Sequence, residues 1–186
     1  MYLRFDSNDT MYVADRNSNC LRKVTTAGNV TTLSGVCNSA GSSNGYVDGP
    51  ASSAKFFWPS GLEIDAAGVV YVADQLNGAI RRIYPNGTAT TFAVISTGGR
   101  QDVWDITMDA NGNIFGAWWG KQTIIKIPGG SNTQTTYAGT YNTDGNVDGT
   151  SARFASPGAI TIDRTTGKIY VANTGDGHIR LITPGQ

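Results

Sequence analysis

Four tandem segments with the same order of local signals constrain this chain more than any other feature. In each segment a short alternating run ends at an aspartate, a turn with Asn or Gly follows, and the next strand is centred on an aromatic residue. Turns of about two to five residues join these strands, which is too short for a parallel crossover. Each segment therefore predicts an up-and-down antiparallel sheet. The aspartates and aromatic residues that mark the segments are Asp6, Asp65, Asp109, Asp163 and Tyr12, Tyr71, Phe115, Tyr170.

The spacing of these segments predicts blades of a β-propeller. The aromatic markers recur about 45 to 60 residues apart, the length of a four-stranded blade with variable loops. One such sheet leaves both faces uncovered, and packing blades around an axis covers them. We therefore predict an all-β fold, a single β-propeller segment over 1–186, whose last unit lacks its outer strand. The units run approximately over 1–35, 36–94, 95–140 and 141–186.

Longer stretches of the second and fourth units resemble the NHL repeat. GYVDGPASSAKFFWPSG (Gly45–Gly61) and GNVDGTSARFASPG (Gly145–Gly158) both lead into I-D, Y-V-A-D/N and I-R-x-I patterns. The third unit departs from the pattern, because FGAWW (Phe115–Trp119) replaces Y-V-A-D. The resemblance implies a propeller of about six blades. We expect an arc of a larger propeller, or one completed by oligomerisation through self-association of open blade edges.

Composition and charge narrow the function classes. The chain has 14 Lys+Arg and 14 Asp+Glu, so it has no net positive charge that would attract it to nucleic acid. No run of about 18 apolar residues occurs, and we predict no membrane insertion. His178 is the only histidine, which excludes a histidine-based metal cage within the chain.

No motif of a catalytic nucleophile or a phosphate-binding loop occurs, and we assign no catalytic residues. The sequence favours a non-enzymatic binding or scaffold module, which meets a protein partner or another ligand through the loops that join blades. Two alternatives stay open. One is a carbohydrate-binding, lectin-like protein, and the other is part of a metal-dependent propeller lyase or hydrolase, which the resemblance implies.

The four tryptophans are the first candidates for a ligand-binding surface. All of them fall in loops or turns that a propeller places on one face, where their rings and nearby polar groups suit stacking against a sugar or a peptide. The alternative is that the rings fill gaps between blades. The candidate residues are Trp58, Trp104, Trp118, Trp119, Arg100, Gln101 and Asp102.

A second candidate site is the loop from Asp144 to Gly149, which matches the opening of a calcium loop. Asp144, Asn146 and Asp148 place oxygen ligands at alternate positions around a glycine turn. The carboxylate expected further along is missing, because Ala155 stands there, so the same residues suit Asx hydrogen bonds in a turn. Calcium is the only cofactor that the sequence suggests. Arginines also recur on the third strands, where we expect them to pack or pair between blades: Arg22, Arg81, Arg82 and Arg180.

The cysteines and the N-glycosylation sequons indicate the cellular compartment of the protein. Cys20 and Cys37 flank one hairpin, so they are either a cross-strand disulfide or two free thiols. Asn8, Asn29 and Asn86 begin N-x-S/T sequons that fall in predicted turns. Both features favour an extracellular, secreted glycoprotein.

Overall fold

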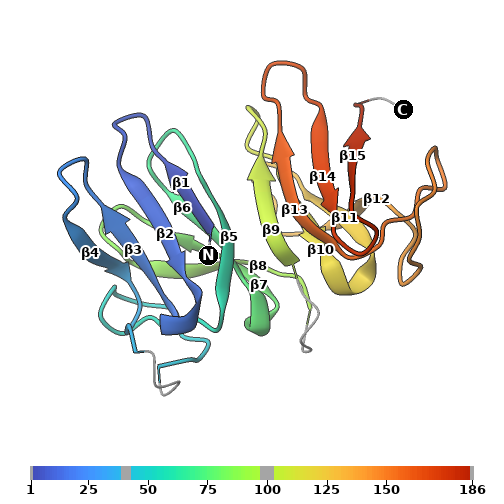
Figure 1. The fold of residues 1–186 in the computed structure, drawn as a ribbon. Helices are drawn as coiled ribbons and strands as arrows, with labels where there is room; N and C mark the ends of the chain where they lie inside the picture. The colour runs from blue at the N-terminus through green and yellow to red at the C-terminus, as the bar shows by residue number, and fades with distance from the viewer. Residues whose placement is uncertain (1, 39–42, 97–102, 185–186) are drawn as a thin grey trace. The chain divides into compact units, whose positions relative to one another are not determined.

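A computed structural model describes residues 2–38, 43–96 and 103–184 of the chain. These residues form four antiparallel sheets in which each strand pairs with the next one in the sequence (Figure 1). The first three sheets have four strands and the last has three. The predicted all-β fold of propeller blades, with an incomplete last blade, is confirmed. By its internal contacts the chain divides into two compact units, Met1–Gly99 and Arg100–Gln186.

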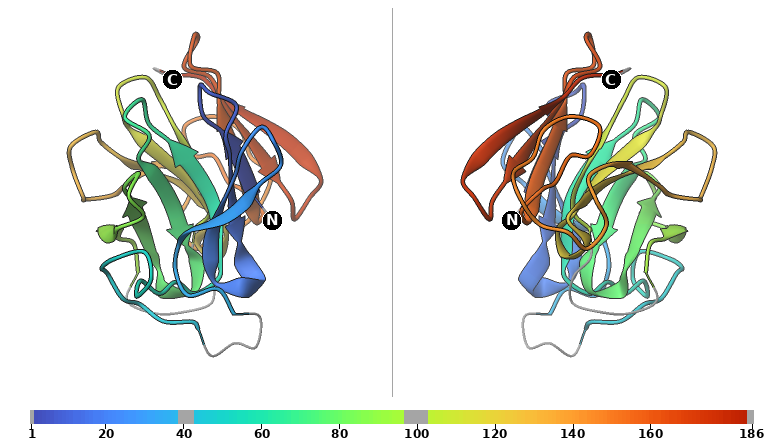
Figure 2. Two further views of the ribbon diagram at one scale, coloured as in Figure 1. Left: turned by 90° about the vertical axis from the view of Figure 1, so that its left-hand side faces the viewer. Right: turned by 90° about the vertical axis from the view of Figure 1, so that its right-hand side faces the viewer.

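The unit Met1–Gly99 consists of the first and second sheets, which pack face to face. In the left view of Figure 2 the blue first sheet lies in front of the green second sheet. Tyr12 and Leu21 of the first sheet and Leu62 and Val72 of the second share one apolar core, and Phe56 from the connecting loop completes it. The strands are β1 (Tyr2–Phe5), β2 (Met11–Asp15), β3 (Cys20–Val24), β4 (Val30–Ser34), β5 (Pro59–Ile64), β6 (Val70–Asp74), β7 (Ala79–Ile83) and β8 (Ala89–Val94).

The unit Arg100–Gln186 repeats this arrangement with the third and last sheets. Phe115 and Ile124 of the third sheet pack with Ile160 and Val171 of the last, and Phe154 from the connecting loop is buried between them. The strands are β9 (Val103–Met108), β10 (Ile114–Trp118), β11 (Thr123–Ile127), β12 (Thr135–Ala138), β13 (Pro157–Ile162), β14 (Ile169–Asn173) and β15 (His178–Ile182).

The repeated aspartates fix the turn between the first and second strands of every sheet. The Oδ1 atom of Asp65 accepts hydrogen bonds from the backbone N–H groups of Ala67 and Val69, at 2.9 Å each. Asp6, Asp109 and Asp163 make the same kind of Asx turn in their own sheets. A short side chain with an acceptor oxygen is therefore favoured there by local geometry alone.

A short 3₁₀ turn joins the second and third strands of the first three sheets. These turns are η1 (Arg16–Ser18), η2 (Gln75–Asn77) and η3 (Trp119–Lys121). Each is followed directly by a residue in the left-handed conformation, and in two of them the side chain of that residue holds the loop leading into the next sheet. Asn19 Oδ1 accepts the N–H of Trp58 at 2.9 Å, and Gln122 Oε1 accepts the N–H of Ser156 at 2.6 Å.

The two cysteines form a disulfide, which decides between the two possibilities left by the sequence. Cys20 on β3 is bonded to Cys37 in the loop after β4, with a Cα–Cα distance of 5.2 Å. Disulfides persist in oxidising compartments, so this bond indicates an environment outside the cytoplasm. No helix within 2–38, 43–96 and 103–184 has the length and apolar character needed to span a membrane.

Candidate functional site

A buried arginine anchors the loop that leads into the second sheet. Arg81 on β7 is fully buried, and its guanidinium donates hydrogen bonds to the carbonyl oxygens of Lys55 and Val47. It also pairs with Asp74 Oδ2 at 2.7 Å and with Asp48 Oδ1 at 2.6 Å. Burial raises the pKa of Asp74 to about 6, although hydrogen bonds from Asn77 and the Phe57 N–H, and the Arg81 charge, act in the opposite direction.

The last sheet has the same arrangement, in which an arginine on the third strand holds the loop that leads into the sheet. We call this arrangement the clamp. Arg180 on β15 donates to the carbonyl oxygens of Arg153 and Val147 and pairs with Asp148. Asn173 takes the place of Asp74, and its Oδ1 accepts the N–H of Ala155 at 2.7 Å. The loop before β13 is therefore fixed in the manner of the loop before β5.

The two clamps differ in what lies on their outer side. In the second sheet β8 occupies this place, where Asp48 Oδ2 accepts the N–H of Thr91 at 2.9 Å. Gly49 and Ala89 also exchange two backbone hydrogen bonds there. In the last sheet no strand among the described residues pairs with the outer edge of β15. The side chain of Asp148 is 92% exposed although it pairs with Arg180.

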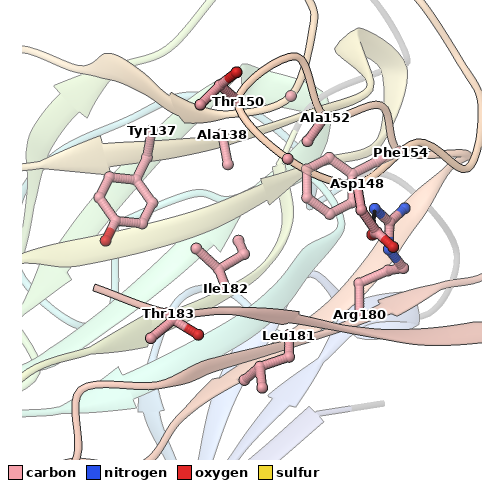
Figure 3. Close-up of a pocket in the computed structure, with 12 residues that line it drawn as sticks. Tyr137, Ala138, Asp148, Thr150, Ala152, Phe154, Arg180, Leu181, Ile182 and Thr183 are labelled. Carbon is pink, nitrogen blue, oxygen red and sulfur yellow. Dashed lines mark hydrogen bonds and ion pairs between the residues drawn. The ribbon is translucent and has the colours of Figure 1, made fainter. Parts of the chain in front are cut away.

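A groove of about 480 Å³ lies at this open edge, and we call it the β15 groove. Figure 3 shows Arg180 and Asp148 at one end of it and Tyr137 at the other, with Ile182 between them. Strand β12, the loop after it and strand β15 build its walls. The lining residues are Tyr137, Ala138, Gly139, Asp148, Gly149, Thr150, Ala152, Phe154, Arg180, Leu181, Ile182 and Thr183.

One face of the last sheet is also apolar and open. Ile179 is 71% exposed, whereas Leu21 and Ile124, at the same strand position in the first and third sheets, are fully buried. Tyr170 is 39% exposed, whereas its equivalent Phe115 is buried. Within residues 2–38, 43–96 and 103–184, the last sheet thus presents apolar side chains beside a strand edge that no other strand pairs with.

The structure brings together two of the four tryptophans. Trp104 and Trp119 are both half-buried, and they stack with their ring centroids 5.6 Å apart. Trp118 is buried and packs edge-on against Tyr141.

Trp58 belongs to the other compact unit, where the guanidinium of Arg16 lies 4.1 Å from its ring centroid. The remaining candidates, Arg100, Gln101 and Asp102, lie outside the described residues.

Two of the three candidate ligands in the calcium-like loop have protein partners. Asp148 is engaged by Arg180, and the amide nitrogen of Asn146 lies 3.2 Å from His178 Nδ1. Asp144 is exposed. Within the part of the chain that the structure describes, no cluster of three or more His, Cys, Asp or Glu side chains has metal-binding geometry. Calcium binding stays a prediction.

The three sequons are accessible. Asn8, Asn29 and Asn86 are exposed and lie in turns between strands, as the sequence predicts. Their glycosylation stays a prediction.

Sequence reasoning missed the β15 groove. The available signal was the repeat itself, because Asp48 and Arg81 in the second unit correspond to Asp148 and Arg180 in the last. Pairing these positions would have indicated a clamp in both sheets.

No protein-family model matches the sequence, and no curated protein matches it either. Solved structures do match. An auxiliary nutrient binding protein from Bacteroides ovatus has a TM-score of 0.74 and 17% identity, over 98% of this chain and 44% of its own. The chain has a β-propeller fold.

Two further matches are to proteins with other names. The structure of a nidogen/laminin complex has a TM-score of 0.73 and 14% identity, over 100% of this chain and 61% of its own. Virginiamycin B lyase from Staphylococcus aureus has a TM-score of 0.65 and 16% identity, over 99% and 55%. This chain spans about half the length of the structures that it matches. At these identities the likeness shows the fold alone.

Proposed function

We propose that this chain is a non-enzymatic binding module of the NHL β-propeller type, which binds a protein partner through a loop that joins two blades. The observation that carries this proposal is the β15 groove, because the loop between β12 and β13 forms one of its walls. We also propose that the two compact units are parts of one propeller segment. The nutrient binding protein and the nidogen/laminin complex support a binding role for this fold.

The chemistry of the groove suits a polypeptide. An open strand edge offers alternating backbone donors and acceptors, which an extended peptide matches along its length. Apolar side chains such as Leu181 and Ile182 line the same edge, and Asp148 adds one exposed carboxylate. Main-chain hydrogen bonds then supply affinity, and the apolar walls select side chains.

Selection from a random peptide library tests the proposal. We expect the immobilised chain to enrich peptides whose binding is lost in Thr150→Trp, because this exposed position lines the groove and the indole fills it. Ser151→Trp is the matched control, since Ser151 is exposed and is not among the lining residues. Enriched peptides that bind both variants equally, or no enrichment at all, would contradict the proposal.

Carbohydrate binding is a second candidate function, and the Trp104–Trp119 stack favours it. Two half-exposed indoles side by side offer apolar faces to a sugar ring. We expect any ligand found on a glycan array to lose at least about tenfold in affinity in Trp119→Ala. Trp58→Ala is the control, because Trp58 lies in the other compact unit. An array without ligands, or equal losses in both variants, would remove this candidate.

A further inference from the structure

The disulfide joins two cysteines of very different accessibility. Cys20 is the first residue of β3 and is fully buried, whereas Cys37 lies in the loop after β4 and is only half-buried. Of the two, Cys37 is therefore the one open to a dissolved thiol. Redox-sensitive cysteines are accessible in this way and lie beside a second cysteine that closes the bond again.

The third sheet shows that the loop forms without a disulfide. Thr123, the first residue of β11, occupies the position of Cys20. Tyr141 stands where Cys37 does, two residues after a glycine whose φ is 95° in the first sheet and 97° in the third. The same turn of the chain is therefore made there with no covalent link between these positions.

A backbone hydrogen bond holds the loop at the same point in both sheets. In the first sheet the N–H of Asn38 donates to the carbonyl oxygen of Ser18 at 3.1 Å. In the third sheet the N–H of Asn142 donates to the carbonyl oxygen of Lys121 at 2.9 Å. Each acceptor is the last residue of a 3₁₀ turn. We therefore expect the first sheet to keep its fold when the disulfide is open.

Two side chains of the first sheet are placed to stabilise Cys37 as a thiolate. The hydroxyl oxygen of Thr32 lies 3.3 Å from Cys37 Sγ, and the hydroxyl is the donor because a disulfide sulfur carries no hydrogen. Arg22 Nη1 donates to the same hydroxyl oxygen at 3.0 Å, and Asp15 fixes the guanidinium from its other side at 3.2 Å. A hydroxyl that accepts a hydrogen bond from a cation donates more strongly, and such a donor favours the thiolate form of cysteine.

We propose that Cys20 and Cys37 form a redox-active disulfide, which undergoes reversible exchange with dithiols through Cys37. This activity goes beyond the proposed binding function. One thiolate of the dithiol attacks Cys37 Sγ, the bond between the two cysteines breaks, and the sulfur of Cys20 leaves with the electron pair.

The second thiol of the dithiol completes the exchange. It gives up its proton, which passes through the solvent to the sulfur of Cys20, and it attacks the mixed disulfide. Cys37 leaves as a thiolate that accepts the hydrogen bond from Thr32. The dithiol is thereby oxidised to a disulfide, and the protein is reduced by two electrons.

Two single-cysteine variants test this inference. In Cys20→Ala, which copies Ala79 at the same place in the second sheet, we expect oxidised glutathione to form a stable mixed disulfide with Cys37. In Cys37→Ala the remaining thiol is buried, and we expect its modification to be at least about tenfold slower. Mass spectrometry follows both reactions over time.

Thr32→Val distinguishes a stabilised thiolate from an ordinary accessible thiol. In the Cys20→Ala background we expect this change to slow the alkylation of Cys37 by iodoacetamide at about pH 7 at least about tenfold, because it removes the donor to sulfur. Thr31→Val is the matched control, because the hydroxyl of Thr31 donates to the carbonyl oxygen of Lys23 instead. We expect this variant to react at the unchanged rate.

Three results would overturn the inference. The first is equal modification of the two single-cysteine variants by glutathione. The second is an alkylation rate that Thr32→Val leaves unchanged. The third is loss of the β-sheet circular dichroism signal when dithiothreitol reduces the wild-type protein, because the bond would then be a requirement of the fold.

Discussion

Replacing Arg81 by Met is expected to lower the free energy of unfolding by about 4 kcal/mol at neutral pH, because it leaves the carboxylate of Asp74 buried without its cation. Arg81 and Asp74 are both fully buried, and their side chains meet at 2.7 Å. The same substitution removes the hydrogen bonds that hold the carbonyl groups of Val47 and Lys55, so the loop leading into β5 loses its anchor. Urea unfolding followed by circular dichroism measures the loss.

Arg22→Met is the matched control. Arg22 occupies the equivalent position on β3 and pairs with Asp15 at 3.2 Å, but both side chains are about 30% exposed. Water screens this pair, and we expect a loss of about 1 kcal/mol or less. Equal losses in the two variants would show that burial of the Arg81–Asp74 pair has no energetic consequence.

The pH dependence of the Arg81→Met effect follows from the raised pKa of Asp74, which is about 6 against an ordinary value of 3.8. The folded protein holds this proton more tightly than the unfolded chain does. The stability that protonation contributes is therefore fully present below pH 3.8 and is lost as the pH rises through about 6. Without the Arg81 charge the pKa of Asp74 rises further, so the variant continues to lose stability above pH 6. We expect the difference between wild type and Arg81→Met to be larger at about pH 8 than at about pH 5.

The second large effect is expected from Gly87→Ala, which should cost about 3 kcal/mol. Gly87 lies in the turn between β7 and β8 with a φ of 83°, and an added Cβ would lie 2.3 Å from the carbonyl oxygen of Leu33 and 2.7 Å from Ala51. About 1 kcal/mol comes from the left-handed backbone and about 2 kcal/mol from forcing the turn away from the first sheet.

Gly28→Ala separates the two contributions. Gly28 occupies the same place in the turn between β3 and β4, with a φ of 80°, and nothing lies within 4 Å of its added Cβ. We expect only the backbone contribution of about 1 kcal/mol. If thermal unfolding shows equal shifts for the two variants, the turn after β7 does not pack against the first sheet as described.

The sheets could be predicted because their signals are local. Asp65 and its equivalents make their own turns, and the aromatic markers alternate within single strands, so repeat spacing sufficed to place all four sheets. Trp118 and Trp119 show where this reasoning stops. They are neighbours in the sequence, yet β10 ends at Trp118 and η3 begins at Trp119, so one ring is buried and the other stacks on Trp104. Only the three-dimensional path of that turn separates their roles.

The candidate site could be predicted only in part, for a related reason. The β15 groove depends on pairing Arg180 with Asp148, 32 positions earlier, across a loop that is shorter than its counterpart before β5. The repeat indicates which residues of the two units correspond, but the path of the loop that brings them together has no periodic signature in a single sequence. The disulfide likewise needed the position of Cys37 in a loop, which alternation along strands does not determine.

The side chains of Asn19 and Gln122 couple the folding of neighbouring sheets. Each directly follows a 3₁₀ turn in one sheet, and each accepts a backbone hydrogen bond from the loop that begins the next. Loosening one of these turns therefore frees the first strand that follows it, and ordering the turn aligns that strand for pairing. Within each compact unit we therefore expect cooperativity to pass along the chain from one sheet to its successor, as in repeat proteins whose energies are sums over adjacent modules.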